Sequence, residues 1–191
     1  MQPEIVPICS SEMPLGLINL DGVSEGHLQR MRRLESTSIS YVHDRLAGTP
    51  KMRAVSIAMA ELELKRFFSL ALLGHDPLAM ISPVIDEMWH QFVLFTREYR
   101  TMCVDVLGFF LDHTPDTVFT PVPATAGQVF IDAYEYRYGR LPPIWFQGMN
   151  ARLKRYYNHR PLVGKPPERW SGWVRPEGLD ISGVANSSLT S

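Results

Sequence analysis

Apolar side chains recur at helical spacing through most of the chain. In residues 50–73, Met52, Val55, Met59, Leu62 and Phe67 follow a period near 3.6 residues, which is typical of an amphipathic helix. The same pattern predicts helices over about 24–46, 50–73, 83–107, 126–138 and 145–157. Strand signals are weak, and residues 117–122 are the best short candidate. The sequence therefore predicts a mainly α fold, a single compact helical domain of four to five helices with irregular arms at both ends.

Prolines, glycines and capping residues set the expected boundaries. Pro3, Pro7, Pro14 and Gly16 interrupt any helix near the start, so residues 1–23 are predicted to form an extended N-terminal arm. Residues 24–160 are the predicted helical domain. Ser82 and Pro83 favour the start of the helix over 83–107, and Gly108 favours its end. Residues 161–191 are predicted to be an irregular, basic and aromatic C-terminal arm and tail.

The helix predicted over 83–107 carries most of the unusual chemistry. One broad side is apolar and suits a core: Met88, Trp89, Phe92, Phe95, Tyr99, Met102, Cys103 and Val106. A narrower stripe holds Asp86, His90, Val93 and Arg97. Asp86 and His90 are four residues apart, so the carboxylate can orient the imidazole for acid–base catalysis or as a metal ligand. Both are therefore the candidate catalytic residues.

A transition-metal site is one interpretation of this stripe. Gly108 allows the chain to turn back, so His90 and His113 could ligate one zinc or other transition-metal ion, with His75 or Asp76 as candidate third ligands. No CxxC or HExxH spacing supports the site. In the alternative interpretation, Asp86 caps the helix and pairs with Arg97, while His90 hydrogen-bonds a buried carbonyl group.

The segment from about Ala60 to Pro115 resembles the glycine-rich-domain-containing-protein-like family. The resemblance rests on ELELKRFFSLALL, similar to an E-x-x-R-F-L segment of that family, and on D-x-x-W-H, L-x-T-x-x-Y, C-x-x-x-x-G and H-x-P, which here begin at Asp86, Leu94, Cys103 and His113. Phe92 stands where many relatives carry a second histidine, and Asp112-His113 stands where many carry two histidines. Both differences remove imidazoles from a metal site. The resemblance implies a helical fold and does not imply an enzyme.

Charge is distributed unevenly, although the formal net charge is only −1. Residues 137–175 hold nine Lys or Arg side chains against the single acid Glu168, and aromatic residues lie between them. Arginine and aromatic side chains are enriched at protein interfaces, and the same mixture can also bind nucleic acid. Because the rest of the chain is acidic, the basic region could also pack back against it or dock on a neighbouring copy. The candidate interaction residues are Arg137, Arg140, Trp145, Arg152, Lys154, Arg155, Tyr156, Arg160, Arg169, Trp170 and Trp173.

Three function classes follow from these observations. The leading hypothesis is a non-catalytic protein-interaction or assembly module, a structural component of a larger multi-protein particle, with a protein partner or self-association. The alternative is a metal-dependent or acid–base enzyme centred on His90, and the second alternative is nucleic-acid binding through the basic C-terminal region. Two cysteines give no disulfide framework, no apolar run is long enough to span a membrane, and the N-terminus lacks signal-peptide features. We therefore expect a cytoplasmic or intracellular protein.

Overall fold

The computed structural model describes residues 13–114, 123 and 125–148. This part of the chain is all-α and contains no strand. Its α-helices are α1 (Glu25–Ser36), α2 (Ser40–Leu46), α3 (Ile57–Leu72), α4 (Pro83–Val93), α5 (Thr96–Thr101) and α6 (Ala126–Tyr138). Short 3₁₀ turns cover Pro14–Gly16, Pro50–Met52 and Pro143–Phe146, and a π-helical turn, η4, covers Met102–Leu107. The predicted mainly α fold class is confirmed.

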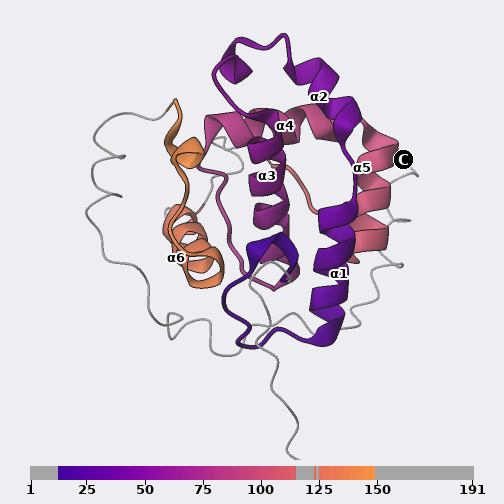
Figure 1. Cartoon of the computed structure of the whole chain (residues 1–191). Coiled ribbons are helices and arrows are strands. Elements are labelled where there is room, and N and C mark those ends of the chain that lie inside the picture. Colours follow the sequence, from indigo (N-terminus) through magenta and orange to yellow (C-terminus); the bar gives the residue numbers. More distant parts are fainter. Residues whose placement is uncertain (1–12, 115–122, 124, 149–191) are drawn as a thin grey trace, which may run out of the picture.

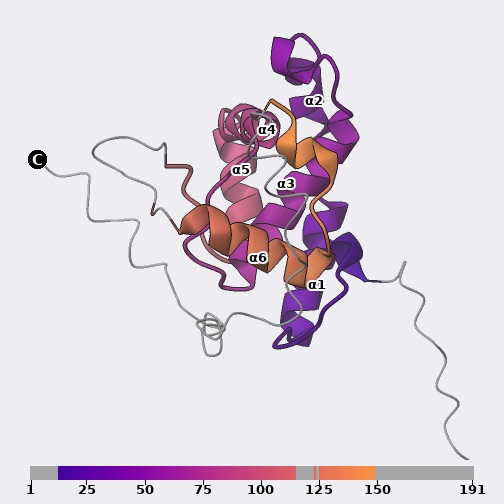
Figure 2. The same cartoon turned by 90° about the vertical axis from the view of Figure 1, so that its left-hand side faces the viewer.

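Helix α3 is the central element of the fold. It lies between α6 on one side and α1 on the other (Figure 1), and it also packs against α4. In Figure 2, α4 is seen nearly end-on while α6 runs across the view, so these two helices cover α3 in different directions. Because α3 is covered on several sides, Ala60, Leu64, Phe68 and Leu70 are almost fully buried. The central helix is thus largely buried, although it also carries the charged residues Glu61, Glu63, Lys65 and Arg66.

Serine residues cap the N-termini of three of the helices. The side chains of Ser24, Ser56 and Ser82 accept hydrogen bonds from the backbone amides of His27, Met59 and Ile85 in the first turns of α1, α3 and α4. Pro83 occupies the first position of α4, where its missing N–H group costs nothing. Gly108 ends η4 with a φ of 83°, a left-handed conformation that glycine adopts without strain.

Two of the predicted long helices are divided. Residues 24–46 form α1 and α2, because the hydroxyl groups of Ser36 and Thr37 donate to the carbonyl oxygen of Arg33 and compete with the helical backbone. Residues 83–107 form α4, α5 and η4, because Phe95 leaves the helical conformation at φ −85° and ψ 64°. Its ring packs on Tyr41, with 4.8 Å between ring centroids. The sequence pattern therefore located the helical regions but not their interruptions.

Other predicted boundaries differ at the edges of the described residues. Helix α3 begins at Ile57 rather than near Pro50, and the helix predicted over 145–157 starts as the short turn Pro143–Phe146. The rest of that predicted helix and the strand predicted over 117–122 lie outside the described residues. Within the predicted N-terminal arm, Leu15 and Leu17 are buried in the hydrophobic core. At least this part of the arm is an integral part of the domain.

Candidate functional site

Helix α4 presents Asp86 and His90 on its outer side. The Ser82 cap and Pro83 fix the start of the helix, so Asp86 lies in the first turn and His90 one turn later. His90 Nδ1 lies 3.6 Å from Asp86 Oδ2. The His90 side chain is 47% exposed and that of Asp86 is 30% exposed, so solvent reaches both groups.

The chain after Gly108 brings a second imidazole to the same carboxylate. His113 Nε2 lies 3.0 Å from Asp86 Oδ1, and the His90 and His113 rings are 4.4 Å apart between centroids. The three side chains offer one donor atom each within 4.8 Å of one another, and no other such group of three occurs in the described part of the chain. We call Asp86, His90 and His113 the His–Asp–His cluster.

The core face of α4 holds His113 in place. The Trp89 indole packs edge-on against the His113 ring, with 4.4 Å between the ring centroids. The indole Nε1 donates a 3.0 Å hydrogen bond to the Tyr99 hydroxyl. The Tyr99 hydroxyl in turn donates to the carbonyl oxygen of Leu111, two residues before His113. Trp89 and Tyr99 therefore fasten the returning segment to α4 and α5, and they restrict the position of His113.

Donor spacing in the cluster suits a single metal ion. Ligand bonds of about 2.0–2.2 Å place neighbouring donor atoms about 3–3.5 Å apart around a zinc-like ion. The His113 Nε2–Asp86 Oδ1 separation of 3.0 Å and the His90 Nδ1–Asp86 Oδ2 separation of 3.6 Å lie near this range, and a different carboxylate oxygen faces each imidazole. Two imidazoles and one carboxylate are the ligand set of non-haem iron(II) sites and of many catalytic zinc sites, and they leave positions open for water or substrate.

Several finer expectations about these residues are corrected. Asp86 does not pair with Arg97, because the Arg97 guanidinium bonds Glu98 at 2.8 Å. His90 faces Asp86 and solvent rather than a buried carbonyl group. Neither His75 nor Asp76 belongs to the cluster; the third group is Asp86, which the sequence had suggested as the orienting carboxylate. His75 is buried, and burial together with the nearby charge of Arg137 lowers its pKa to about 4.

A second polar group lies in the core and was not predicted. Glu63 of α3 is fully buried, and its carboxylate accepts hydrogen bonds from Tyr134 and Trp145 at 2.7 Å and from Arg66 at 2.9 Å. We call these four residues the Glu63 centre. The spacing that could have revealed it is E-x-x-R, because Glu63 and Arg66 are on neighbouring turns of one helix. The fully satisfied carboxylate ties α3 to α6 and to the turn at 143–146.

The structure places two candidate interaction residues in the core. Arg137 is 6% exposed and donates to the carbonyl oxygen of Asn19, and Trp145 is fully buried against Glu63. The burial of these two side chains agrees with packing of this region against the rest of the chain, and in the described structure they offer no surface to a partner. Arg140 is exposed. The remaining candidates lie outside the described residues: Arg152, Lys154, Arg155, Tyr156, Arg160, Arg169, Trp170 and Trp173.

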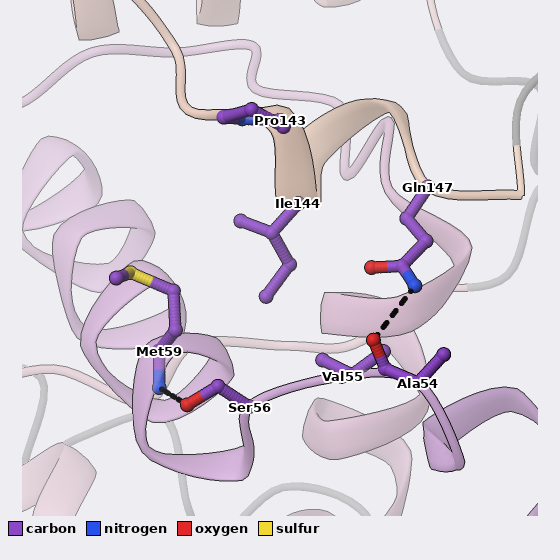
Figure 3. Close-up of a pocket in the computed structure, with 7 residues that line it drawn as sticks. All are labelled: Ala54, Val55, Ser56, Met59, Pro143, Ile144 and Gln147. Atoms are coloured by element: carbon purple, nitrogen blue, oxygen red, sulfur yellow. Dashed lines mark hydrogen bonds between the residues drawn. The ribbon is translucent and has the colours of Figure 1, made fainter.

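A shallow groove lies apart from the His–Asp–His cluster and shares no residue with it. Its volume is about 440 Å³ (Figure 3). The residues that line it are Ala54, Val55, Ser56, Met59, Pro143, Ile144 and Gln147. The Gln147 amide donates a 3.2 Å hydrogen bond to the carbonyl oxygen of Ala54 and joins the two walls. The groove contains no ionisable side chain, so it offers shape and apolar contact but no acid–base or metal chemistry.

Comparison with known proteins gives one result. A family model described as UCP032817-like matches residues 32–137, more than half of the chain, so the chain belongs to the UCP032817-like family. No curated protein and no solved structure matches. The matched segment includes all three residues of the His–Asp–His cluster. Among the described helices, none is long and apolar enough to cross a membrane.

Proposed function

We propose that this member of the UCP032817-like family is a metal-dependent enzyme that binds one divalent transition-metal ion through Asp86, His90 and His113. The observation that carries the proposal is the return of His113 to the carboxylate shared with His90, across 27 residues of sequence. One carboxylate and two imidazoles supply three ligands, and the half-exposed edge at His90 leaves room for water or substrate.

The chemistry of such a site follows from its open positions. A bound ion lowers the pKa of a coordinated water molecule, polarises a substrate carbonyl or phosphoryl oxygen, or activates dioxygen if it is iron. Within this chain, Asp86 also contacts both imidazoles directly, so it aligns the two rings before any ion arrives. Trp89 limits motion of His113 from the other side.

Metal binding by the purified protein tests the proposal. We expect near-stoichiometric binding of Zn²⁺, Co²⁺ or Fe²⁺ in calorimetric titrations, and loss of most of this binding in Asp86→Asn, His90→Gln and His113→Gln. His43→Gln is the matched control, because His43 also contacts a carboxylate, Glu61 at 2.6 Å, but is not part of the cluster. Equal metal binding by wild type and the three cluster variants would contradict the proposal.

The assembly module is our second-ranked hypothesis and remains a prediction. Its predicted contacts include Arg137 and Trp145, which are buried, whereas most of the others lie outside the described residues. Nucleic-acid binding is ranked third for the same reason. Both classes predict association that does not depend on the His–Asp–His cluster. Sedimentation of wild type and His113→Gln with and without added RNA separates these classes from the enzyme.

A further inference from the structure

The segment that carries His113 to the His–Asp–His cluster begins at Gly108, where η4 ends. His113 lies five residues after Gly108, and a fully extended chain of that length spans at most about 18 Å. Because the segment is short, the point at which it leaves η4 restricts where the His113 imidazole can lie. Any contact that fixes the end of η4 therefore contributes to the geometry of the cluster.

Arg30 of α1 makes such a contact. Its Nη1 donates a 3.2 Å hydrogen bond to the carbonyl oxygen of Val106, in the last turn of η4. The last carbonyl groups of a helix lack partners within the helix, and a cation near them also complements the negative end of the helix dipole. Helix α1 packs against both η4 and α3. Arg30 thus ties the end of η4 to the core of the fold.

The Arg30 guanidinium also lies directly against the backbone at Gly108. Gly108 has a φ of 83°, which glycine adopts without strain. A Cβ atom at this position would have both terminal nitrogens and the central carbon of the guanidinium within 3.0 Å of it, closer than atoms can pack. The absence of a side chain at residue 108 is therefore what lets Arg30 approach the turn.

The other end of the segment is held by a different set of contacts. The Tyr99 hydroxyl donates to the carbonyl oxygen of Leu111, and the Trp89 indole packs on the His113 ring. These contacts come from α4 and α5, whereas the contact at the start of the segment comes from α1. The segment is thus fixed at both ends, and Arg30 connects its start to a helix that contributes no residue to the cluster.

We propose that Arg30 is a positioning residue for the proposed metal ligand His113. By capping η4 and packing against Gly108, it sets the direction in which the chain leaves the helix and so the separation of the His113 imidazole from Asp86. The inference rests on the proposed function and deepens it, because it adds a residue that tunes metal affinity without contacting the ion. Groups that orient metal ligands from outside the ligand set typically contribute about 10- to 100-fold to affinity.

Nuclear magnetic resonance of the metal-free full chain tests the inference independently of metal binding. The Trp89 and His113 ring centroids are 4.4 Å apart, so we expect a strong nuclear Overhauser effect between their ring protons in wild type. Arg30→Met keeps an apolar stem but removes the donor, and it is expected to lose most of this effect. Arg32→Met is the matched control, because it removes an exposed arginine of the same helix that pairs with Glu25, and it is expected to match wild type.

A glycine substitution tests the same contact from the other side. In Gly108→Ala the added methyl group displaces the Arg30 guanidinium, so we expect a similar loss of the Trp89–His113 effect. Gly148→Ala is the control for backbone strain, because Gly148 also has a φ of 83° but a Cβ atom there would make only an ordinary contact, 3.7 Å from Pro83. This pair of variants keeps the inference testable if Arg30→Met does not fold.

Cobalt binding measures the consequence for the site. We expect Arg30→Met to weaken Co²⁺ binding about tenfold and to change the visible absorption spectrum of the bound ion, because one imidazole is displaced. Arg30→Lys keeps a cationic donor for the Val106 carbonyl and is expected to recover most of the affinity. In a His113→Gln background, Arg30→Met is expected to cause no further loss of the residual binding, because Arg30 acts through His113.

The outcomes separate the two proposals. Failure of wild type to bind a divalent ion contradicts the proposed function, whereas the nuclear Overhauser effect in metal-free protein still decides whether Arg30 positions His113. An undiminished effect in Arg30→Met overturns the inference and leaves the proposed metal site intact. An equal loss of cobalt affinity on Arg30→Met with and without His113 also overturns it, because such a loss does not pass through the imidazole.

Discussion

The Glu63 centre and the His–Asp–His cluster are each built around one carboxylate, but their surroundings differ. Glu63 is fully buried, and an indole, a phenol and a guanidinium donate hydrogen bonds to it. Asp86 is partly exposed and contacts two imidazoles, one of which is nearly half exposed. The first carboxylate has all its partners inside the protein, whereas the second can exchange protons or a metal ion with solvent. A buried carboxylate whose hydrogen-bonding partners are all internal, such as Glu63, favours stability. A partly exposed carboxylate shared by two imidazoles, such as Asp86, favours acid–base or metal chemistry.

Substitution of Glu63 should give the largest loss in the free energy of unfolding, because it disrupts the Glu63 centre. Glu63→Gln removes the negative charge that faces Arg66 and turns two acceptor oxygens into one, and loss of one member of a buried ion pair costs about 3–5 kcal/mol. Urea denaturation followed by circular dichroism measures this loss. Glu25→Gln, which disrupts an exposed pair with Arg32, is the control and is expected to change stability by less than about 1 kcal/mol.

A second buried ionisable group, His75, should make the stability of the protein depend on pH in the acidic range. Burial and then the charge of Arg137 lower the pKa of His75 from 6.5 to about 4, so the folded protein keeps this imidazole neutral while the unfolded chain protonates it. Stability should therefore fall as the pH drops from about 6.5 to 4, by about 3 kcal/mol at 1.4 kcal/mol per unit. Thermal unfolding across this range measures the slope. We expect a flatter profile for His75→Gln, and an unchanged profile would contradict the assignment.

Stabilisation by a bound metal ion is the next largest expected effect, and it should depend on the His–Asp–His cluster alone. An ion present at a hundred times its dissociation constant stabilises a protein that binds it only when folded by about 2.7 kcal/mol. We expect this gain for wild type and for Tyr134→Phe, and its absence in Asp86→Asn. Melting curves with and without Co²⁺ show the difference, and a metal-independent melting temperature for wild type would contradict the site.

Removing one hydroxyl group should produce a smaller loss at the Glu63 centre. Tyr134→Phe deletes the donor to Glu63 and an acceptor for Arg66, which costs about 1–2 kcal/mol. Tyr41→Phe is a matched control at a ring that packs against Phe92 and Phe95. We expect denaturation midpoints to shift clearly for Tyr134→Phe and hardly at all for Tyr41→Phe.

The smallest expected loss of stability is that of His113→Gln in the absence of metal, and it compares the Asp86 carboxylate directly with the Glu63 carboxylate. Without metal, His113→Gln loses one contact with the partly exposed Asp86, and such pairs contribute less than about 1 kcal/mol. A loss as large as that of Glu63→Gln would mean that the cluster is a structural centre like the first. Denaturation of both variants in the presence of a chelator makes the comparison.

Local sequence signals predicted much of the fold but not its interruptions. Ser24, Ser82, Pro83 and Gly108 act where their types predict, because capping and left-handed turns depend on neighbouring backbone atoms. The break at Phe95 was not predictable, because that ring leaves the helix to pack on Tyr41 from another helix. A helix-period pattern continues through such a break, so only the packing partner reveals it.

Prediction of the candidate site was similarly divided. The Asp86–His90 pair followed from its spacing within one helix, and the proximity of His113 was a hypothesis that the structure supports through its 3.0 Å contact with Asp86. Composition did not reveal that Arg137 and Trp145 are buried, because it records that a side chain is basic or aromatic but not which way it points. The Glu63 centre was missed because two of its four members, Tyr134 and Trp145, are about seventy to eighty residues away from Glu63 in sequence.

By itself, the sequence determined the helical class, the capped starts of α1 and α4, and the presence of a carboxylate and an imidazole on one face of α4. These properties depend on interactions within one or two helical turns. Only the tertiary structure decided which carboxylate is buried and satisfied and which is shared between two imidazoles near the surface. The physical reason is that burial and the meeting of distant side chains depend on how α3, α4, α6 and the segment after Gly108 pack together, and no local pattern encodes that packing.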